Sequence, residues 1–352
     1  MKRLLPLFLL LAGCATTRVP PPPPPPPPVT EVEMRTTIGV LARDDFEGRM
    51  AGTPGADKAA AYIAERFRAA GLDTMPGGFL QAFKVNRART ALPAESVKLP
   101  PGQRLFIDHM NQRGTFTAYN VVGRVTGQAP DGRVVLVMAH YDHLGLCASE
   151  GTADRICNGA VDNASGVAAV IAVAERVAKM QLDRDVWFVT TSAEEWGLLG
   201  AKAFADSPPV ELGRIIAGFN LDTIAIAPNG MPVAMVAAKG VTLEPLVRDS
   251  AAAMGRSWDG DDEAANFLQR QDGWALAQRG VPMIMAGGSF SDLKLLNTYL
   301  EKTYHSPSDE LRPHTELGGA VDDANLHVEL VRRAASRASL PSFGAVPHFG
   351  HR

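Results

Sequence analysis

The sequence predicts an α/β fold in which a mixed, mostly parallel sheet lies between two layers of helices. Segments rich in β-branched and aromatic residues alternate along the chain with segments whose apolar residues recur at helical spacing. Such an order is typical of a sheet that is covered by helices on both faces. The chain has 352 residues, of which 46% are hydrophobic, so it can bury a large core. Its formal net charge of -3 does not favour nucleic acid as a partner.

The first residues have the pattern of a secretory signal peptide. Lys2 and Arg3 supply the positive charge, and the apolar run LLPLFLLLAG that follows is too short to span a bilayer as a mature helix. The end of this run, from Leu11 to Cys14, resembles the lipobox of bacterial lipoproteins, in which the cysteine is lipidated and becomes the new N-terminus. We therefore expect residues 1–13 to be removed and Cys14 to carry a membrane anchor. An ordinary signal peptide with an incidental cysteine is the alternative.

A run of prolines from Pro20 to Pro28 follows the cysteine. Proline has no backbone N–H group, so this run favours a stiff polyproline II rod. Residues 14–30 are therefore expected to be a spacer between the lipid and the folded domain, with a ligand tract for a proline-binding domain as the alternative. Residues 31–338 are expected to form one domain, because no further low-complexity segment divides them, and residues 339–352 a C-terminal tail.

The domain begins with helical patterns and continues with alternating strands and helices. Helices are predicted over residues 32–45 and 55–72, with the second ending at Gly71, and again over residues 165–179 and 196–205. Strands are predicted over residues 119–127, 133–140, 186–194, 214–222 and 281–287. Ligands of such folds bind at the carboxyl ends of the strands.

Side chains that can bind metal or transfer protons gather where these predicted strands end. The residues are His140 and Asp142, Glu194 and Glu195, Asp222, and Asp162 in the turn before the helix at Ser165. Each has an ordinary explanation when taken alone, such as helix capping for Asp162 or a loop position for His305. Their joint occurrence at the strand ends predicts that they form one site.

The candidate residues lie in the segments AHYDHLG, NGAVDNASG, AEEWGLLGA, NLDTI and YHSPSDE, with FEGRMAGTPG near the start of the domain and RQDGWALAQRGVP near its end. Taken together, these segments resemble those of the co-catalytic di-zinc metallopeptidases, the family of bacterial leucyl aminopeptidases and glutamate carboxypeptidases. The resemblance implies the phosphorylase/hydrolase-like fold of the zinc-dependent exopeptidases. Two positions depart from the family pattern: Thr223 replaces a frequent methionine, and Val161 replaces a frequent second acid.

The resemblance also implies a ligand set for two Zn²⁺ ions. His140 and Asp222 would bind one ion, Glu195 and His305 the other, and Asp162 would bridge them. Each ion then has three protein ligands and an open position, which a catalytic zinc needs. The three carboxylates and a bridging hydroxide would balance the charge of the two ions. Co²⁺ or Mn²⁺ could replace zinc with these ligands.

Further roles follow from the same resemblance and from strand geometry. Glu194 would be the general base, because the side chains of adjacent glutamates diverge and Glu195 is the ligand. Asp142 lies two residues beyond His140, so we expect its carboxylate to accept a hydrogen bond from the second ring nitrogen of that histidine. By the same alternation, His143 is expected to point away and to bind no metal.

Three further expectations concern local structure. Tyr304 could donate a hydrogen bond to the reacting oxyanion, as a tyrosine does in some relatives, or it could simply pack. Relatives have a cis peptide bond after the bridging aspartate, so we expect one after Asp162. A disulfide between Cys147 and Cys157 is favoured over two free thiols, since an exported chain meets an oxidising compartment.

The sequence as a whole therefore predicts an exported, lipid-anchored metallo-aminopeptidase that removes N-terminal residues from peptides. A carboxypeptidase of the same family, a glutaminyl cyclase-like acyltransferase with a single zinc, and a binding lipoprotein without activity are the alternatives. Ala15 follows the lipidation site in place of an aspartate, which favours the outer membrane, facing the periplasm, if the cell has that envelope. Peptides and the membrane are the expected partners.

Overall fold

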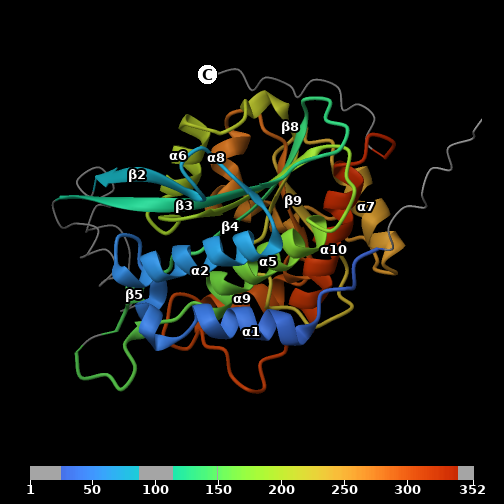
Figure 1. Ribbon diagram of the computed structural model, residues 1–352. Helices are drawn as coiled ribbons and strands as arrows, with labels where there is room; N and C mark the ends of the chain where they lie inside the picture. Colours follow the sequence, from blue (N-terminus) through green and yellow to red (C-terminus); the bar gives the residue numbers. More distant parts are fainter. Residues whose placement is uncertain (1–24, 87–113, 149, 340–352) are drawn as a thin grey trace, which may run out of the picture.

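The computed structural model describes residues 25–86, 114–148 and 150–339. The predicted signal peptide, Cys14 and the tail from residue 340 lie outside the described residues. Within them, an eight-stranded mixed sheet lies between helices, and the predicted α/β class is confirmed (Figure 1). No helix among the described residues is long and apolar enough to cross a membrane.

The strands of the main sheet have the following bounds. They are β1 (Asp73–Thr74), β2 (Leu80–Asn86), β3 (Thr115–Val125), β4 (Val134–His140), β7 (Asp185–Thr191), β8 (Ile215–Asn220), β9 (Ala234–Ala237) and β10 (Met283–Gly287). A separate two-stranded sheet pairs β5 (Gly145–Leu146) with β6 (Ile156–Cys157). All the predicted strands are present, whereas β1, β2, β5, β6 and β9 were not predicted.

The helices are shorter or more irregular than the sequence patterns suggest in a few places. The α-helices are α1 (Glu31–Leu41), α2 (Pro54–Ala70), α5 (Gly166–Val177), α6 (Leu199–Asp206), α7 (Glu244–Ala253), α8 (Gly273–Ala277), α9 (Leu293–Lys302) and α10 (Gly318–Ala334). Short segments of other helix types are η1 (Asp44–Arg49), η2 (Ala160–Ser165), η3 (Leu212–Arg214), η4 (Glu263–Arg270) and η5 (Gly288–Phe290). The helix predicted from Trp196 begins only at Leu199, because the preceding residues turn at the end of β7.

The centre of the sheet is parallel and its flanks are antiparallel. The strand order is β1-β3-β7-β4-β8-β10-β9, with β2 paired to β3. β4 pairs in parallel with both β7 and β8, and β8 pairs in parallel with β10. Every residue of β4 is buried, as expected for a central strand that is covered on both faces. The carboxyl ends of these four strands therefore meet at one edge of the sheet.

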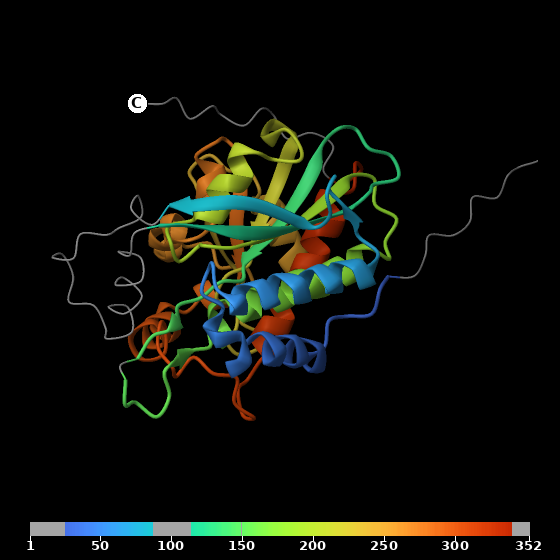
Figure 2. The same cartoon turned by 60° about the vertical axis from the view of Figure 1, so that its left-hand side comes forward.

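The helices form a thick layer on one face and a thin layer on the other. Figure 1 shows α1, α2, α5 and α10 on one side of the sheet and α6 and α8 on the other, and the turned view in Figure 2 shows the same layers. α5 packs between the sheet and the other helices of the thick layer, so nearly all of its residues are buried. Its composition of alanine, valine and glycine suits this central position, because small side chains allow close approach of the neighbouring elements.

Candidate active site

The central parallel strands carry the predicted ligands to one edge of the sheet. His140 is the last residue of β4, Glu195 follows β7, and Asp222 follows β8. Asp162 lies in η2, the irregular turn that leads into α5, and His305 lies in the loop after α9. Because β7 and β8 flank β4 in parallel, their carboxyl ends bring these side chains together.

Two groups of donor atoms share the carboxylate of Asp162. In the first group, Nε2 of His140 lies 3.2 Å from Oδ1 of Asp162 and 3.4 Å from Oδ1 of Asp222. In the second group, Nε2 of His305 lies 3.2 Å from Oδ2 of Asp162 and 3.1 Å from Oε2 of Glu195. The two oxygens of Asp162 thus face different groups, as the bridging position expected from the sequence requires.

The expectation that the side chain of His143 points away from the site was wrong. Its ring does not point away but lies in the second group, with Nδ1 at 2.9 Å from Oε1 of Glu195 and 3.6 Å from Oδ2 of Asp162. The side chain is fully buried, and its ring packs edge-on against that of His305 with 5.5 Å between centroids. The alternation of side chains fails here because β4 ends at His140 and the chain then leaves the extended strand.

The expectation that the carboxylate of Asp142 accepts a hydrogen bond from His140 was also wrong. Nδ1 of His140 lies 3.1 Å from the backbone carbonyl oxygen of Asp142, but 3.9 Å from the nearest carboxylate oxygen of this residue. The carboxylate instead accepts a hydrogen bond from the backbone N–H of Glu194 at 3.1 Å. Asp142 therefore orients the histidine ring through its main chain, while its side chain holds the segment that carries the two glutamates.

The turn that carries Asp162 is fixed from two sides. The peptide bond between Asp162 and Asn163 is cis, as predicted. The carboxylate of Asp309 accepts hydrogen bonds from the backbone N–H groups of Val161 at 2.9 Å and Asp162 at 3.0 Å. From the other side, the fully buried guanidinium of Arg49 donates to the carbonyls of residues 158 and 159.

Neither Arg49 nor Asp309 was assigned a role from the sequence. The only signal in the sequence is their position inside the segments FEGRMAGTPG and YHSPSDE, which carry the family resemblance. A charged residue in such a segment is expected to have a partner, yet most of the partners here are backbone groups, together with the hydroxyl of Tyr299, which donates to Asp309. Only the folded chain identifies them.

A pocket opens beside the first group of donor atoms. Polar lining comes from His140, Asp162, Glu194, Asp222, Thr223, Arg270, Gln271 and Tyr304, and apolar lining from Phe267, Met285, Phe290, Leu296 and Leu300. Glu194 lines this pocket and Glu195 does not, so the two adjacent glutamates face different surroundings. The apolar residues come from η4, β10, η5 and α9, and none of them was predicted from the sequence.

Comparison with known proteins identifies the family. Residues 120–328, which are more than half of the chain, match the family described as Peptidase family M28. The chain belongs to peptidase family M28. Its match includes every strand that carries a predicted ligand.

The chain spans about half or less of the length of two curated relatives. The alkaline phosphatase isozyme conversion protein of Escherichia coli K12 is 27% identical over 225 residues, which are 60% of this chain and 56% of that protein. Aminopeptidase YwaD of Bacillus subtilis strain 168 is 30% identical over 110 residues, 31% of this chain and 22% of that protein.

Solved structures share the fold over nearly the whole chain. A zinc aminopeptidase from Bacillus subtilis, BSAP, superposes with a TM-score of 0.63 at 16% identity, covering 91% of this chain and 98% of its own. A glutaminyl cyclase from Bacteroides thetaiotaomicron gives a TM-score of 0.60 at 15% identity, covering 87% and 98%. Both activities therefore occur on this fold.

The spacing of the donor atoms in this M28 chain fits metal binding. Zinc bonds to nitrogen and oxygen are about 2.0–2.2 Å long, so two ligand atoms of a tetrahedral zinc lie roughly 3.3 Å apart. The distances from His140 to its two carboxylate neighbours, 3.2 and 3.4 Å, match this value. Those from His305 to Asp162 and Glu195, 3.2 and 3.1 Å, match it equally well. Histidine nitrogens and carboxylate oxygens are donors that zinc accepts.

The electrostatics of the buried groups indicate a site that favours positive charge. Burial opposes protonation of His305, but Glu195 and Asp162 outweigh burial and raise the pKa of this histidine to about 10. Burial and the neighbouring carboxylates of Glu195 and Asp272 hold the pKa of Glu194 well above its usual range. Carboxylates outnumber imidazoles in the site, so divalent cations suit it better than protons on the histidines alone.

Tyr304 contributes an aromatic wall to the site. Its ring stacks on that of His305 with 3.6 Å between centroids, and the tyrosine also lines the pocket. Burial and the carboxylates of Asp162 and Glu195 hold the pKa of the phenol well above its usual range, so the hydroxyl keeps its proton. The phenol is thus available as a hydrogen-bond donor.

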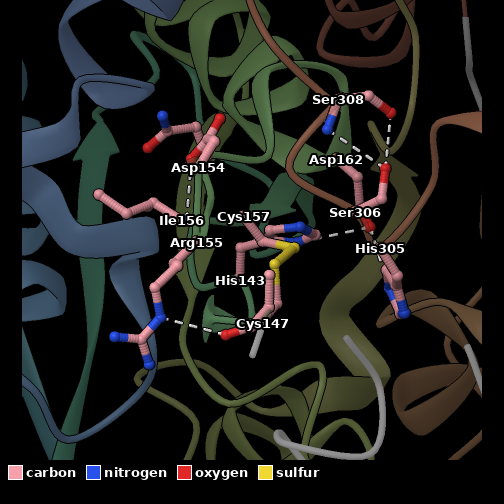
Figure 3. Close-up of a disulfide and its surroundings, with 12 residues drawn as sticks. His143, Cys147, Asp154, Arg155, Ile156, Cys157, Asp162, His305, Ser306 and Ser308 are labelled. Atoms are coloured by element: carbon pink, nitrogen blue, oxygen red, sulfur yellow. Dashed lines mark hydrogen bonds and ion pairs between the residues drawn. A yellow bond between two sulfur atoms is a disulfide. The ribbon is translucent and has the colours of Figure 1, made fainter. Parts of the chain in front are cut away.

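The two cysteines form a disulfide between the ligand segments. Cys147 and Cys157 are bonded, with their Cα atoms 5.7 Å apart, and both are fully buried. Figure 3 shows the ring of His143 beside this disulfide and facing Asp162. The bond closes the loop between β5 and β6, which connects the segment after β4 to the turn of Asp162.

Proposed function

We propose that this M28 chain is a zinc-dependent aminopeptidase that hydrolyses the N-terminal peptide bond of its substrates. The observation that carries the proposal is the carboxylate of Asp162, whose two oxygens face two separate groups of donor atoms beside a pocket. Membership of family M28 and the aminopeptidases among its relatives support this activity.

The residues that would hold the metal follow from the donor groups. His140 and Asp222 would bind one Zn²⁺, Glu195 and His305 a second, and Asp162 would bridge them; Co²⁺ or Mn²⁺ suit the same donors. Bound zinc supplies a Lewis acid for the scissile carbonyl and a water of lowered pKa. The count of two ions is part of the proposal.

Glu194 is the proposed general base. It lines the pocket next to the first donor group, and it is not needed as a ligand because Glu195 faces the histidines of the second group. From this position its carboxylate would take a proton from water and pass it to the leaving amine. The hydrogen bond from its backbone N–H to Asp142 fixes the segment from which it reaches into the pocket.

The pocket determines which substrates fit. Its apolar wall would receive an apolar side chain of the N-terminal residue, because burial of such a chain is favourable by about 25 cal/mol per Å². Tyr304, which keeps its proton, would donate a hydrogen bond to the oxygen of the scissile carbonyl as charge develops there.

A glutaminyl cyclase-like reaction is the second candidate function, since a cyclase shares the fold. Such an enzyme would need one zinc, whereas this chain has a complete second group at Glu195 and His305. Metal analysis of the zinc-loaded protein separates the two: activity that needs two bound ions per chain supports the peptidase, and full activity with one ion supports the cyclase.

The direct test is an assay of zinc-loaded protein on aminoacyl peptides, with N-acetylated and C-terminally blocked versions of each. We expect hydrolysis that N-acetylation abolishes and C-terminal blocking leaves intact. The opposite pattern would identify a carboxypeptidase, and no turnover by the loaded protein would support a binding protein.

Replacement of Glu194 tests the chemistry apart from the binding. Glu194→Gln keeps the size of the side chain but cannot accept the proton, so kcat should fall by about 10²-fold or more with both ions retained. Glu301→Gln, on the exposed surface of α9, is the matched control and should leave kcat unchanged. Loss of metal in Glu194→Gln would instead mean that the two glutamates have exchanged roles.

We also propose that the enzyme is exported and held at the outer membrane by a lipid on Cys14. The lipobox-like segment and the proline spacer support this location, and both precede the first helix of the domain. The folded domain would then face the periplasm at the end of the spacer.

A further inference from the structure

The second donor group contains one side chain more than the first. His143, Asp162, Glu195 and His305 each offer a donor atom, and these atoms all lie within 4.8 Å of one another. The first group has only His140, Asp162 and Asp222. The family resemblance gave no role to His143.

The distances around His143 are those of a metal ligand. Its Nδ1 lies 2.9 Å from Oε1 of Glu195 and 3.6 Å from Oδ2 of Asp162. These values lie on either side of the roughly 3.3 Å that separates two ligands of a tetrahedral zinc. The two oxygens of Glu195 face different rings, Oε1 toward His143 and Oε2 toward His305. The donors therefore surround one common point.

The fold holds the ring of His143 in this place. The close approach of Gly159 leaves no space beside the ring, since a Cβ atom on that glycine would lie 2.7 Å from Cγ and Cδ2 of the imidazole. Gly159 has a φ of 55°, which also favours glycine. Among the described residues, Nε2 of His143 has no hydrogen-bond partner, so the polar contacts of the ring are made through Nδ1.

The two groups also differ in their access to the pocket. His140 and Asp222 line the pocket, whereas His143, Glu195 and His305 do not. Four protein ligands close the coordination of a zinc ion, as in structural sites, and three leave a position open, as in catalytic sites. The group with the open position is thus the one that substrate can reach.

We propose that His143 is a fourth protein ligand in the second donor group, which makes the two metal sites unequal. The ion held by His143, Asp162, Glu195 and His305 is bound tightly and serves to position Asp162. The ion held by His140, Asp162 and Asp222 exchanges more readily and meets the substrate. This inference rests on the proposed metal centre.

The test compares His143→Asn with the wild-type protein. An asparagine amide can replace the hydrogen bond from Nδ1 to Glu195, but it does not replace an imidazole as a ligand. His143→Ala removes both, and His314→Ala is the matched control, because that histidine is exposed. Zinc affinities are measured by competition with a chelator, and the number of imidazoles per ion by X-ray absorption spectroscopy. Melting of the metal-free proteins checks the fold.

We expect three imidazoles per two ions in the wild-type protein and two in His143→Asn. Mutation of a residue that only hydrogen-bonds to a metal ligand lowers metal affinity by roughly 10–100-fold. In His143→Asn, the affinity for the tighter ion should fall by more than this. His143→Ala should behave similarly, and His314→Ala should match the wild type.

Three results would overturn the inference or the proposed function on which it rests. An unchanged imidazole count in His143→Asn, with an affinity loss of 100-fold or less, would show that His143 only orients Glu195, and the inference would be wrong. If a variant does not fold without metal, the imidazole count of the wild-type protein alone decides, since two imidazoles per two ions refutes the proposal. A wild-type protein that binds no zinc would instead overturn the proposed function.

Discussion

Replacement of Arg49 should destabilise the domain strongly, although this residue is not a proposed ligand. Its side chain is fully buried and donates four hydrogen bonds to backbone carbonyls. The acceptors are Leu41 and Asn158 at 2.6 Å each, Tyr141 at 2.7 Å and Gly159 at 3.0 Å. Burial lowers the pKa of Arg49 to about 10, with Asp309 and Asp162 opposing this shift, so the guanidinium is charged at neutral pH.

The expected magnitude follows from these bonds. Gly159 also accepts a hydrogen bond from the N–H of Ala164, so we count only the other three acceptors. A buried carbonyl that loses its donor costs about 1–1.5 kcal/mol at the lower end of the usual range, so the three carbonyls together give about 3–4.5 kcal/mol for Arg49→Met. Methionine keeps most of the side-chain volume, so packing should contribute little. A loss of this size lowers Tm by roughly 5–7 °C in a domain of this size, because the entropy of unfolding grows with chain length.

The assay is urea unfolding of Arg49→Met in the presence of a chelator, so that lost metal does not contribute. Arg43→Met is the matched control, because the side chain of Arg43 is 60% exposed and pairs only with the exposed Asp45. That exposed pair is worth less than about 1 kcal/mol. A free energy of unfolding for Arg49→Met within about 1 kcal/mol of the wild type would refute the reasoning.

Three further predictions concern other parts of the molecule. Replacing Cys147 and Cys157 by serine should lower the free energy of unfolding in urea by about 2–3 kcal/mol, because the bond closes a loop with a separation of 10 residues; equal stability would contradict this. Burial lowers the pKa of His327 to about 4, so stability should fall by up to about 3 kcal/mol as pH drops from 6.5 to 4. His327→Met should weaken this dependence of the free energy of unfolding on pH, as measured by urea unfolding at several pH values. Burial raises the pKa of Asp323 to about 6 despite Arg256, so Asp323 stabilises the fold as the pH falls, and it does so in both proteins. Cys14→Ser should release the protein from the membrane fraction or leave it unprocessed, and a wild-type chain without lipid mass would contradict the anchor.

The sequence by itself determined the fold class and indicated where the proposed ligands gather. The central strands are continuous apolar runs, and a ligand residue at the end of such a run must lie at the carboxyl edge of the sheet. His140 and Asp222 could therefore be placed near one another from the strand pattern alone, whereas the bridging position of Asp162, in the turn before the helix, was added through the family resemblance. The order of the strand-end residues along the chain also carried the family resemblance, which the match to family M28 confirms.

Only the tertiary structure decided which atoms meet. Alternation of side chains placed His143 away from the site and the carboxylate of Asp142 on the ring of His140, but alternation holds only while the backbone stays in a strand, and β4 ends at His140. The apolar wall of the pocket comes from segments that are distant in sequence, and nothing in their local pattern distinguishes them from core residues. The partners of Arg49 are backbone carbonyls, which every residue has, so their identity depends on the path of the folded chain alone.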